Sequence, residues 1–110
     1  MTDGFKCIQK QMEEHADTHT RILLPERKAL IRRQYELLAS ELEDEADFSY
    51  CEEADAVHLT ITADSLLTCA ESGQNFNFLM GLADCSEIRT EDSRIVVYLW
   101  FRCWKWVENC

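Results

Sequence analysis

Residues 95–106 read IVVYLWFRCWKW and hold all three tryptophans of the chain. Side chains of a β-strand point alternately to its two faces, so this stretch divides into two sets. One set is mainly aliphatic: Ile95, Val97, Leu99, Phe101 and Cys103. The other is mainly aromatic and includes one arginine: Val96, Tyr98, Trp100, Arg102, Trp104 and Trp106. Two apolar faces predict a strand at the centre of a sheet, or one that is covered on both sides.

Two further strands are predicted upstream of this stretch. The segment SEIRT, residues 86–90, is separated from it by the polar cluster 91–93, which favours an antiparallel hairpin. Residues 56–63, AVHLTITA, alternate apolar with polar positions, as a half-buried strand does. Residues 64–83 fit either a helix or a strand, and Gly73 would end a short helix that begins near Asp64.

The first 47 residues carry a helical pattern instead. Apolar residues recur at steps of three and four from Phe5 to Leu23, which predicts one amphipathic helix. Pro25 suits the first turn of a second helix, whose apolar stripe continues to about Ala46.

Together these segments predict a single α+β domain over residues 1–110. An N-terminal helical hairpin, joined near Leu24, packs on a small antiparallel β-sheet. Residues 1–47 form the helical part and residues 55–107 the mainly β part.

Charge limits the function of the chain. The formal net charge is −10, and residues 41–110 contain fifteen acidic and four basic residues, whereas residues 1–40 contain six and seven. Nucleic acid and anionic lipid carry the same sign, so direct binding to either is disfavoured. A protein partner with a basic surface is favoured. The basic cluster on the second helix has Glu36 one turn from Arg32 and Arg33, as in a charge-balanced, solvated face.

The acidic segment 41–55, ELEDEADFSYCEEAD, is the first candidate for partner binding. It lacks the glycine and the alternating oxygen ligands of a calcium loop. Either it is a solvated helix end and loop, or its carboxylates engage a basic groove where that groove expects phosphates. The candidate residues are Glu43, Asp44, Glu45, Asp47, Glu52, Glu53 and Asp55.

The aromatic face of residues 95–106 is the second candidate. Internal packing, self-association and partner binding all require such a face to be covered. The candidate residues are Tyr98, Trp100, Trp104 and Trp106.

No motif indicates an enzyme, and we predict no catalytic residue, cofactor or metal. The spacing of His15 and His19 would suit a metal on a helix, but no further ligands accompany them, so packing histidines are favoured. A thiolate pair of Cys51 with His58 lacks an orienting acid. The P-loop, dinucleotide-binding, nucleophile-elbow and zinc-protease motifs do not occur.

Six cysteines occur without a CxxC pair: Cys7, Cys51, Cys69, Cys85, Cys103 and Cys110. The N-terminal residues lack the pattern of a signal peptide, and no apolar run is long enough to span a bilayer. We therefore expect a cytoplasmic protein without a membrane partner, with reduced thiols that are mostly buried and Cys110 as an exposed thiol.

These observations favour a small acidic regulator or inhibitor that binds another protein and is not an enzyme. Its target would be a protein with a basic surface, such as one that handles nucleic acid, and the profile is shared by small phage and mobile-element proteins. The alternative is an assembly protein that forms a homodimer through the aromatic strand. A small metal- or thiol-dependent enzyme is the least favoured hypothesis.

Overall fold

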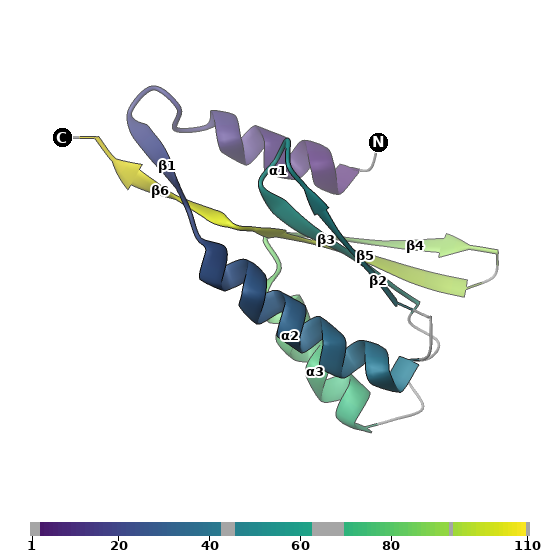
Figure 1. Ribbon diagram of the computed structural model, residues 1–110. Helices are drawn as coiled ribbons and strands as arrows, with labels where there is room; N and C mark the ends of the chain where they lie inside the picture. The colour runs from purple at the N-terminus through teal and green to yellow at the C-terminus, as the bar shows by residue number, and fades with distance from the viewer. Residues whose placement is uncertain (1–2, 43–45, 63–69, 93, 110) are drawn as a thin grey trace.

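The computed structural model describes residues 3–42, 46–62, 70–92 and 94–109. In chain order the elements are α1 (Asp3–Glu13), β1 (His19–Leu23), α2 (Pro25–Leu42), β2 (Ala46–Cys51), β3 (Ala56–Thr62), α3 (Ala70–Leu82), β4 (Cys85–Glu91), β5 (Arg94–Arg102) and β6 (Trp104–Glu108). Four strands form an antiparallel sheet in the order β2-β3-β5-β4, and β1 pairs with β6 in a second antiparallel sheet (Figure 1). The predicted α+β class with a small antiparallel sheet is confirmed.

The stretch at residues 95–106 forms two strands that belong to different sheets. β5 lies between β3 and β4, so the predicted central position is confirmed. At Cys103 the chain turns: its N–H donates to the carbonyl of Asp55 at 2.9 Å, and its carbonyl accepts from the N–H of Leu24 at 2.6 Å. Beyond this residue, β6 pairs with β1. The predicted hairpin of residues 86–90 with β5 is also confirmed, and Asp92 in its turn has a φ of 50°.

An ion cluster holds this turn to the neighbouring elements. The carboxylate of Asp84, just before β4, accepts a hydrogen bond from the backbone N–H of Arg102 at 2.7 Å. Arg27 of α2 donates through Nη2 to the same carboxylate at 3.3 Å and to the carbonyl of Leu82 at 2.9 Å. The Nε of Arg102 lies 3.4 Å from Asp84 Oδ1 and forms an ion pair without hydrogen-bond geometry. Asp84 therefore joins α2 to the β5–β6 junction, and Arg27 links the same cluster to the end of α3.

Helices α2 and α3 lie side by side on one face of the four-stranded sheet, which we call the inner face (Figure 1). The alternation predicted for residues 56–63 and 95–106 explains which side chains the two helices cover, because every second residue of β3 and β5 points toward α2 and α3. The most deeply buried members of this core are Ile31, Leu38, Val57, Leu59, Ile61, Leu79, Leu99 and Phe101, each with no exposed surface.

Helix α1 crosses the opposite, outer face and covers only one end of it (Figure 1). Its apolar side chains Phe5 and Ile8 pack into a second, smaller cluster with Ala54, Ala56, Cys85 and Trp100. Gly4 lies so close to the indole of Trp100 that a Cβ there would come within 2.2 Å of Trp100 Cδ1. Only glycine therefore allows this approach of α1.

Two segments differ from their predicted secondary structure. Residues 19–23, expected to continue the first helix, form β1, and Ile22 and Leu23 are 44% and 59% exposed. The helix predicted from the spacing of apolar residues was wrong here, because pairing with β6, some 80 residues away, decides the conformation of this segment. Residues 46–51 were expected within a helix end and loop, but they form β2, whose Ala46, Phe48 and Tyr50 pack against the inner core.

The ambiguous segment 64–83 contains α3 from Ala70 onward. The helix continues through Gly73, so the expectation that this glycine ends a helix was wrong. Residues 63–69, including Cys69, lie outside the described residues.

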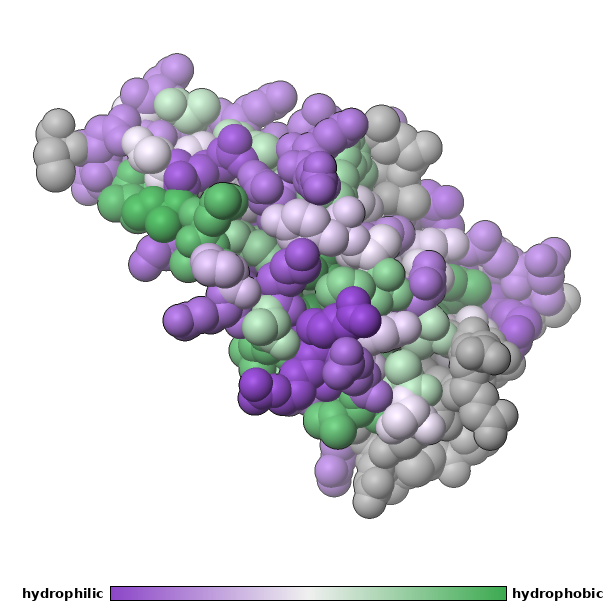
Figure 2. Space-filling model, viewed as in Figure 1, coloured by the Kyte–Doolittle hydropathy of each residue, from purple (hydrophilic) through white to green (hydrophobic). Residues whose placement is uncertain are grey.

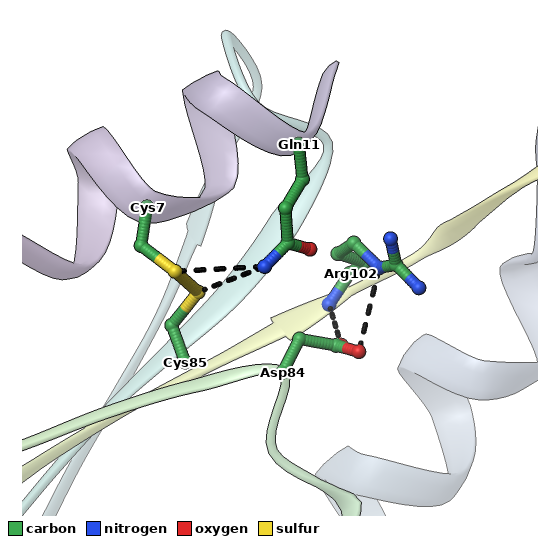
Figure 3. The surroundings of a disulfide bond; sticks show 5 residues. All are labelled: Cys7, Gln11, Asp84, Cys85 and Arg102. Atoms are coloured by element: carbon green, nitrogen blue, oxygen red, sulfur yellow. Dashed lines mark hydrogen bonds and ion pairs between the residues drawn. A yellow bond between two sulfur atoms is a disulfide. The ribbon is translucent and has the colours of Figure 1, made fainter. Parts of the chain in front are cut away.

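The expectation of reduced thiols is wrong for two cysteines. Cys7 of α1 and Cys85 of β4 form a disulfide bond, and the side-chain amide of Gln11 lies 3.5 and 3.4 Å from their sulfur atoms (Figure 3). The folded chain brings together two cysteines that are 78 positions apart, which no local pattern in the sequence reveals. Cys51 and Cys103 are free, and Cys103 is buried as expected. Burial raises the pKa of the Cys103 thiol.

Candidate functional site

The aromatic set from the sequence is mostly used inside the molecule. Trp100 is 5% exposed and meets the edge of the Phe5 ring, with 5.9 Å between ring centroids. Trp104 is fully buried and donates through Nε1 to the carbonyl of Ala54 at 3.0 Å. Trp106 is half-buried and donates to the carbonyl of Gln11 at 3.1 Å. A partner therefore cannot reach Trp100 or Trp104 as they are placed here.

The outer face beside α1 carries a stack of rings with unpaired polar atoms. His58 of β3 stacks on Trp100 with 4.4 Å between centroids and lies 6.0 Å from the ring of Tyr98. Buried atoms without a hydrogen-bond partner include His58 Nε2, Trp100 Nε1 and Glu87 Oε2. Burial lowers the pKa of His58 from its ordinary value of 6.5, and the nearby charge of Asp47 opposes the shift. Tyr98 remains partly exposed and donates to the carboxylate of Glu91, a bond that raises the pKa of Tyr98.

Of the predicted acidic residues that the structure describes, Asp47 lies apart from Glu52 and Glu53. Glu43, Asp44 and Glu45 lie outside the described residues. Asp47 is exposed at the start of β2, whereas Glu52 and Glu53 are exposed in the turn after its end, about 16 Å away by the rise of a strand.

Asp55 contributes to the fold. It is half-buried, has a φ of 46°, and forms an ion pair with Arg21 at 3.6 Å. The hydroxyl of Tyr50 also lies 3.5 Å from its carboxylate. Because these contacts hold the turn between β2 and β3, Asp55 is less available to a partner than Glu52 and Glu53.

The structure instead creates an acidic hollow between α1 and the β2–β3 turn, which approach each other in Figure 1. The hollow has a volume of about 300 Å³. Carboxylates of Glu13 and Glu53 stand on its rim, and both side chains are exposed. The other lining residues are Phe5, Gln9, Met12, Arg21 and Ala54.

Among the described residues that line this hollow, Arg21 is the one with a basic side chain, and its charge is already engaged. Its guanidinium pairs with Asp55 and lies 5.6 Å from the ring centroid of Trp104. The carboxylates of Glu13 and Glu53 therefore dominate the unpaired charge at the rim. Sequence reasoning missed Glu13 because it lies in the nearly neutral part of the chain, 40 positions from Glu53.

Apolar side chains are exposed on both faces of the β1–β6 ribbon. Val107 pairs with Thr20, so Ile22 and Val107, which are 44% and 37% exposed, point to one face, and Leu23, which is 59% exposed, points to the other. Figure 2 shows hydrophobic residues gathered over this part of the molecule, beside mainly hydrophilic surroundings. A second hollow of about 400 Å³ adjoins the ribbon and is lined by residues 23–27. The face that carries Ile22 and Val107 is a separate candidate for association.

The two histidines of the HxxxH pattern are brought together, but not on a helix. His15 lies in the turn after α1 and His19 begins β1, with 4.9 Å between their ring centroids and the edge of Trp106 beside both. In the part of the chain that the structure describes, no three His, Cys, Asp or Glu residues are arranged to hold a metal ion.

The remaining sequence predictions concern the basic helix face and the membrane. Arg32 donates to Glu36 at 2.9 Å, so the predicted pairing on α2 is confirmed. Lys28 and Arg32 also lie over the rings of Tyr50 and Phe48, at 4.1 and 4.7 Å from the ring centroids. Among the described helices, none is both long and apolar enough to cross a bilayer.

No family model matches the sequence, and comparison with curated proteins and with solved structures gives no match.

Proposed function

We propose that this chain is a non-enzymatic regulator that binds a basic surface of another protein through the acidic hollow between α1 and the β2–β3 turn. The observation that carries the proposal is the placement of two exposed carboxylates, Glu13 and Glu53, on the rim of a hollow with apolar side chains in its wall.

This combination suits the side chain of an arginine or a lysine from the partner. Such a side chain has an apolar stem and a charged head. The stem would pack against Phe5, Met12 and Ala54, and the head would lie between Glu13 and Glu53. An arginine fits better than a lysine, because its planar guanidinium can pair with two carboxylates at once.

The charge of the whole chain supports the same class of partner. A net charge of −10 accelerates the approach of a basic protein and repels nucleic acid. A basic groove that normally holds phosphates is therefore a suitable target, and occupying it would inhibit a nucleic-acid-handling protein. Glu52, next to Glu53 and exposed, extends the acidic surface toward such a groove.

The test is capture of partners from the native host by immobilised chain at low and high salt, read by quantitative mass spectrometry. Wild type is compared with Glu13→Gln/Glu53→Gln. The matched control is Glu26→Gln/Asp47→Asn, which removes two exposed charges elsewhere. We expect to find a basic protein that wild type and the control variant both capture at low salt. High salt should release it, and Glu13→Gln/Glu53→Gln, the hollow variant, should fail to capture it.

Two results would contradict the proposal. Partners retained equally by wild type and the hollow variant would exclude the hollow as the binding site. Equal loss with both double variants would mean that only the total charge matters.

A second function, self-association, is supported by the exposed apolar side chains of Ile22 and Val107 on one face of the β1–β6 ribbon. Sedimentation analysis at rising concentration tests it, with Ile22→Ser as the variant and Ile88→Ser, at a 64% exposed site on β4, as the control. Self-association predicts a dimer that only Ile22→Ser weakens. A concentration-independent monomer would exclude it.

A further inference from the structure

We propose that the Cys7–Cys85 disulfide is a redox latch, which holds α1 closed over the outer face of the sheet and releases it on reduction. The proposal concerns α1 and its attachment, and it does not depend on the identity of any partner.

Helix α1 is attached separately from the main core. Phe5 and Ile8 belong to the small outer cluster, whereas α2 and α3 build the inner core with β3 and β5. The polar attachment at its far end is the hydrogen bond from Trp106 Nε1 to the carbonyl of Gln11. Release of α1 would therefore leave the inner core and the four-stranded sheet in place.

The closed position has an energetic cost that release would remove. Under and beside α1, Trp100 Nε1 and His58 Nε2 are buried without a hydrogen-bond partner. Buried polar atoms without a partner have lost their hydrogen bonds to water, which is unfavourable. When α1 is released, water can reach Trp100 Nε1, because the indole of Trp100 lies directly against Gly4 and Phe5 of α1. The burial of Phe5 and Ile8 favours the closed position. The free energies of the closed and released positions of α1 therefore differ less than they would if α1 were part of a continuous core.

A covalent bond at this place can decide between the two positions. Cys7 lies on α1 and Cys85 on β4, so the bond fixes the helix directly to the edge strand of the sheet (Figure 3). While it is intact, α1 can move only a short distance from the outer face. Once it is broken, α1 loses its covalent attachment to β4 and is held by non-covalent contacts, which include the packing of Phe5 and Ile8 and the hydrogen bond from Trp106 to Gln11.

The disulfide is accessible to a thiol reagent. It borders a surface hollow of about 360 Å³ lined by Gly4, Cys7, Cys85, Ser86 and Glu87. Cys7 is half-buried, whereas Cys85 is 7% exposed. Attack from the Cys7 side is therefore the open route.

The reaction requires a dithiol reductant. One thiolate of the reductant attacks Cys7 Sγ, which breaks the bond to Cys85 and forms a mixed disulfide. The second thiolate of the reductant then displaces Cys7. Two electrons and two protons pass to the protein, which gains two thiols, and the reductant leaves as its own disulfide. A small-molecule disulfide reverses these steps.

Amide hydrogen exchange on the full chain, with dithiothreitol as the reductant, tests the latch. Peptide mapping first establishes the Cys7–Cys85 bond, and alkylation of both thiols verifies its reduction. We expect exchange in residues 5–13 to become at least tenfold faster on reduction and to recover on reoxidation, while β3 and α2 stay protected. Cys7→Ser should show the fast exchange without reductant. The control Cys51→Ala, which removes the thiol of a free cysteine at the edge of the outer cluster and keeps an apolar side chain there, should behave like wild type.

Three results would overturn the proposal. The first is a purified, air-oxidised chain without the Cys7–Cys85 bond. The second is unchanged exchange of residues 5–13 after both thiols have been alkylated. The third is loss of protection in α1, α2 and β3 together, which would make the bond a general stabiliser of the fold.

Discussion

Replacement of Asp84 by alanine should destabilise the protein strongly, because this carboxylate is a shared partner at the junction of the two sheets. The side chain of Asp84 is 17% exposed, and those of Arg27 and Arg102 are each 27% exposed. The change removes the acceptor of the Arg102 backbone N–H and leaves two guanidinium groups without their carboxylate. Removing one partner of a buried pair costs about 3–5 kcal/mol, and the remaining solvent access favours the lower end, about 3 kcal/mol.

Urea denaturation measures this effect. With a slope of about 1.5 kcal/mol per molar urea for a chain of this size, the midpoint should fall by about 2 M. The control is Glu36→Ala, which breaks the Arg32–Glu36 pair at 2.9 Å between side chains that are 55% and 60% exposed. Such a pair contributes less than about 0.5 kcal/mol. The reasoning is refuted if Asp84→Ala lowers the free energy of unfolding by less than about 1 kcal/mol, or if Glu36→Ala has an equal effect.

Three further outcomes are expected. Gly4→Ala would place a methyl group against the indole of Trp100, so α1 should shift and its amide exchange should accelerate, with a cost of about 1–3 kcal/mol by denaturation. Because the folded state lowers the pKa of His58, the unfolded chain takes up a proton more readily, so the contribution of His58 to stability is complete above pH 6.5 and is lost as the pH falls below it. The difference in stability between wild type and His58→Gln, compared at pH 8 and pH 5, checks this. A His58 pKa above 6.5, measured by NMR titration, would contradict it. Leu99→Ala in the inner core should lower the free energy of unfolding by about 3–4 kcal/mol in urea denaturation, whereas Ile88→Ala at a 64% exposed site should lower it by less than about 1 kcal/mol. Equal destabilisation by the two variants would contradict the assignment of Leu99 to the core.

The parts of the fold that sequence reasoning predicts are those set by local patterns. The alternation of Val57, Leu59 and Ile61 gives β3 and its buried face, and all three are fully buried in the structure. The polar residues Glu91 and Asp92 mark the turn of the β4–β5 hairpin, and Pro25 marks the start of α2.

The parts that were missed depend on contacts between distant residues. Five residues are too few to distinguish a strand from a helix by period, so His19–Leu23 was assigned with its helical neighbour. Residues 46–51 contain one acid, Asp47, but they lie within the acidic segment 41–55, whose charge drew attention away from the two-residue alternation of Ala46, Phe48 and Tyr50.

The candidate site was predictable only in its chemistry. The excess of carboxylates indicates a basic partner, and Glu52 and Glu53 were selected from the acidic segment itself. The proximity of Glu53 to Glu13 depends on where α1 crosses the sheet, and this depends on Phe5, Ile8 and the disulfide. Likewise, the aromatic face of residues 95–106 reads as a surface in need of a cover, but the sequence does not show that α1 and Ala54 supply that cover.

The pairing of β1 with β6 also affects how fast the chain folds. Leu23 meets Trp104 across a loop of about 80 residues, and closing a loop of this length is slow because of its entropy. The Cys7–Cys85 bond provides a shorter covalent route of about 35 residues between the same two positions, which lowers the closure cost by about 0.7 kcal/mol. The oxidised chain should therefore complete the ribbon about three to four times faster than the reduced chain, so forming the disulfide first favours formation of the second sheet.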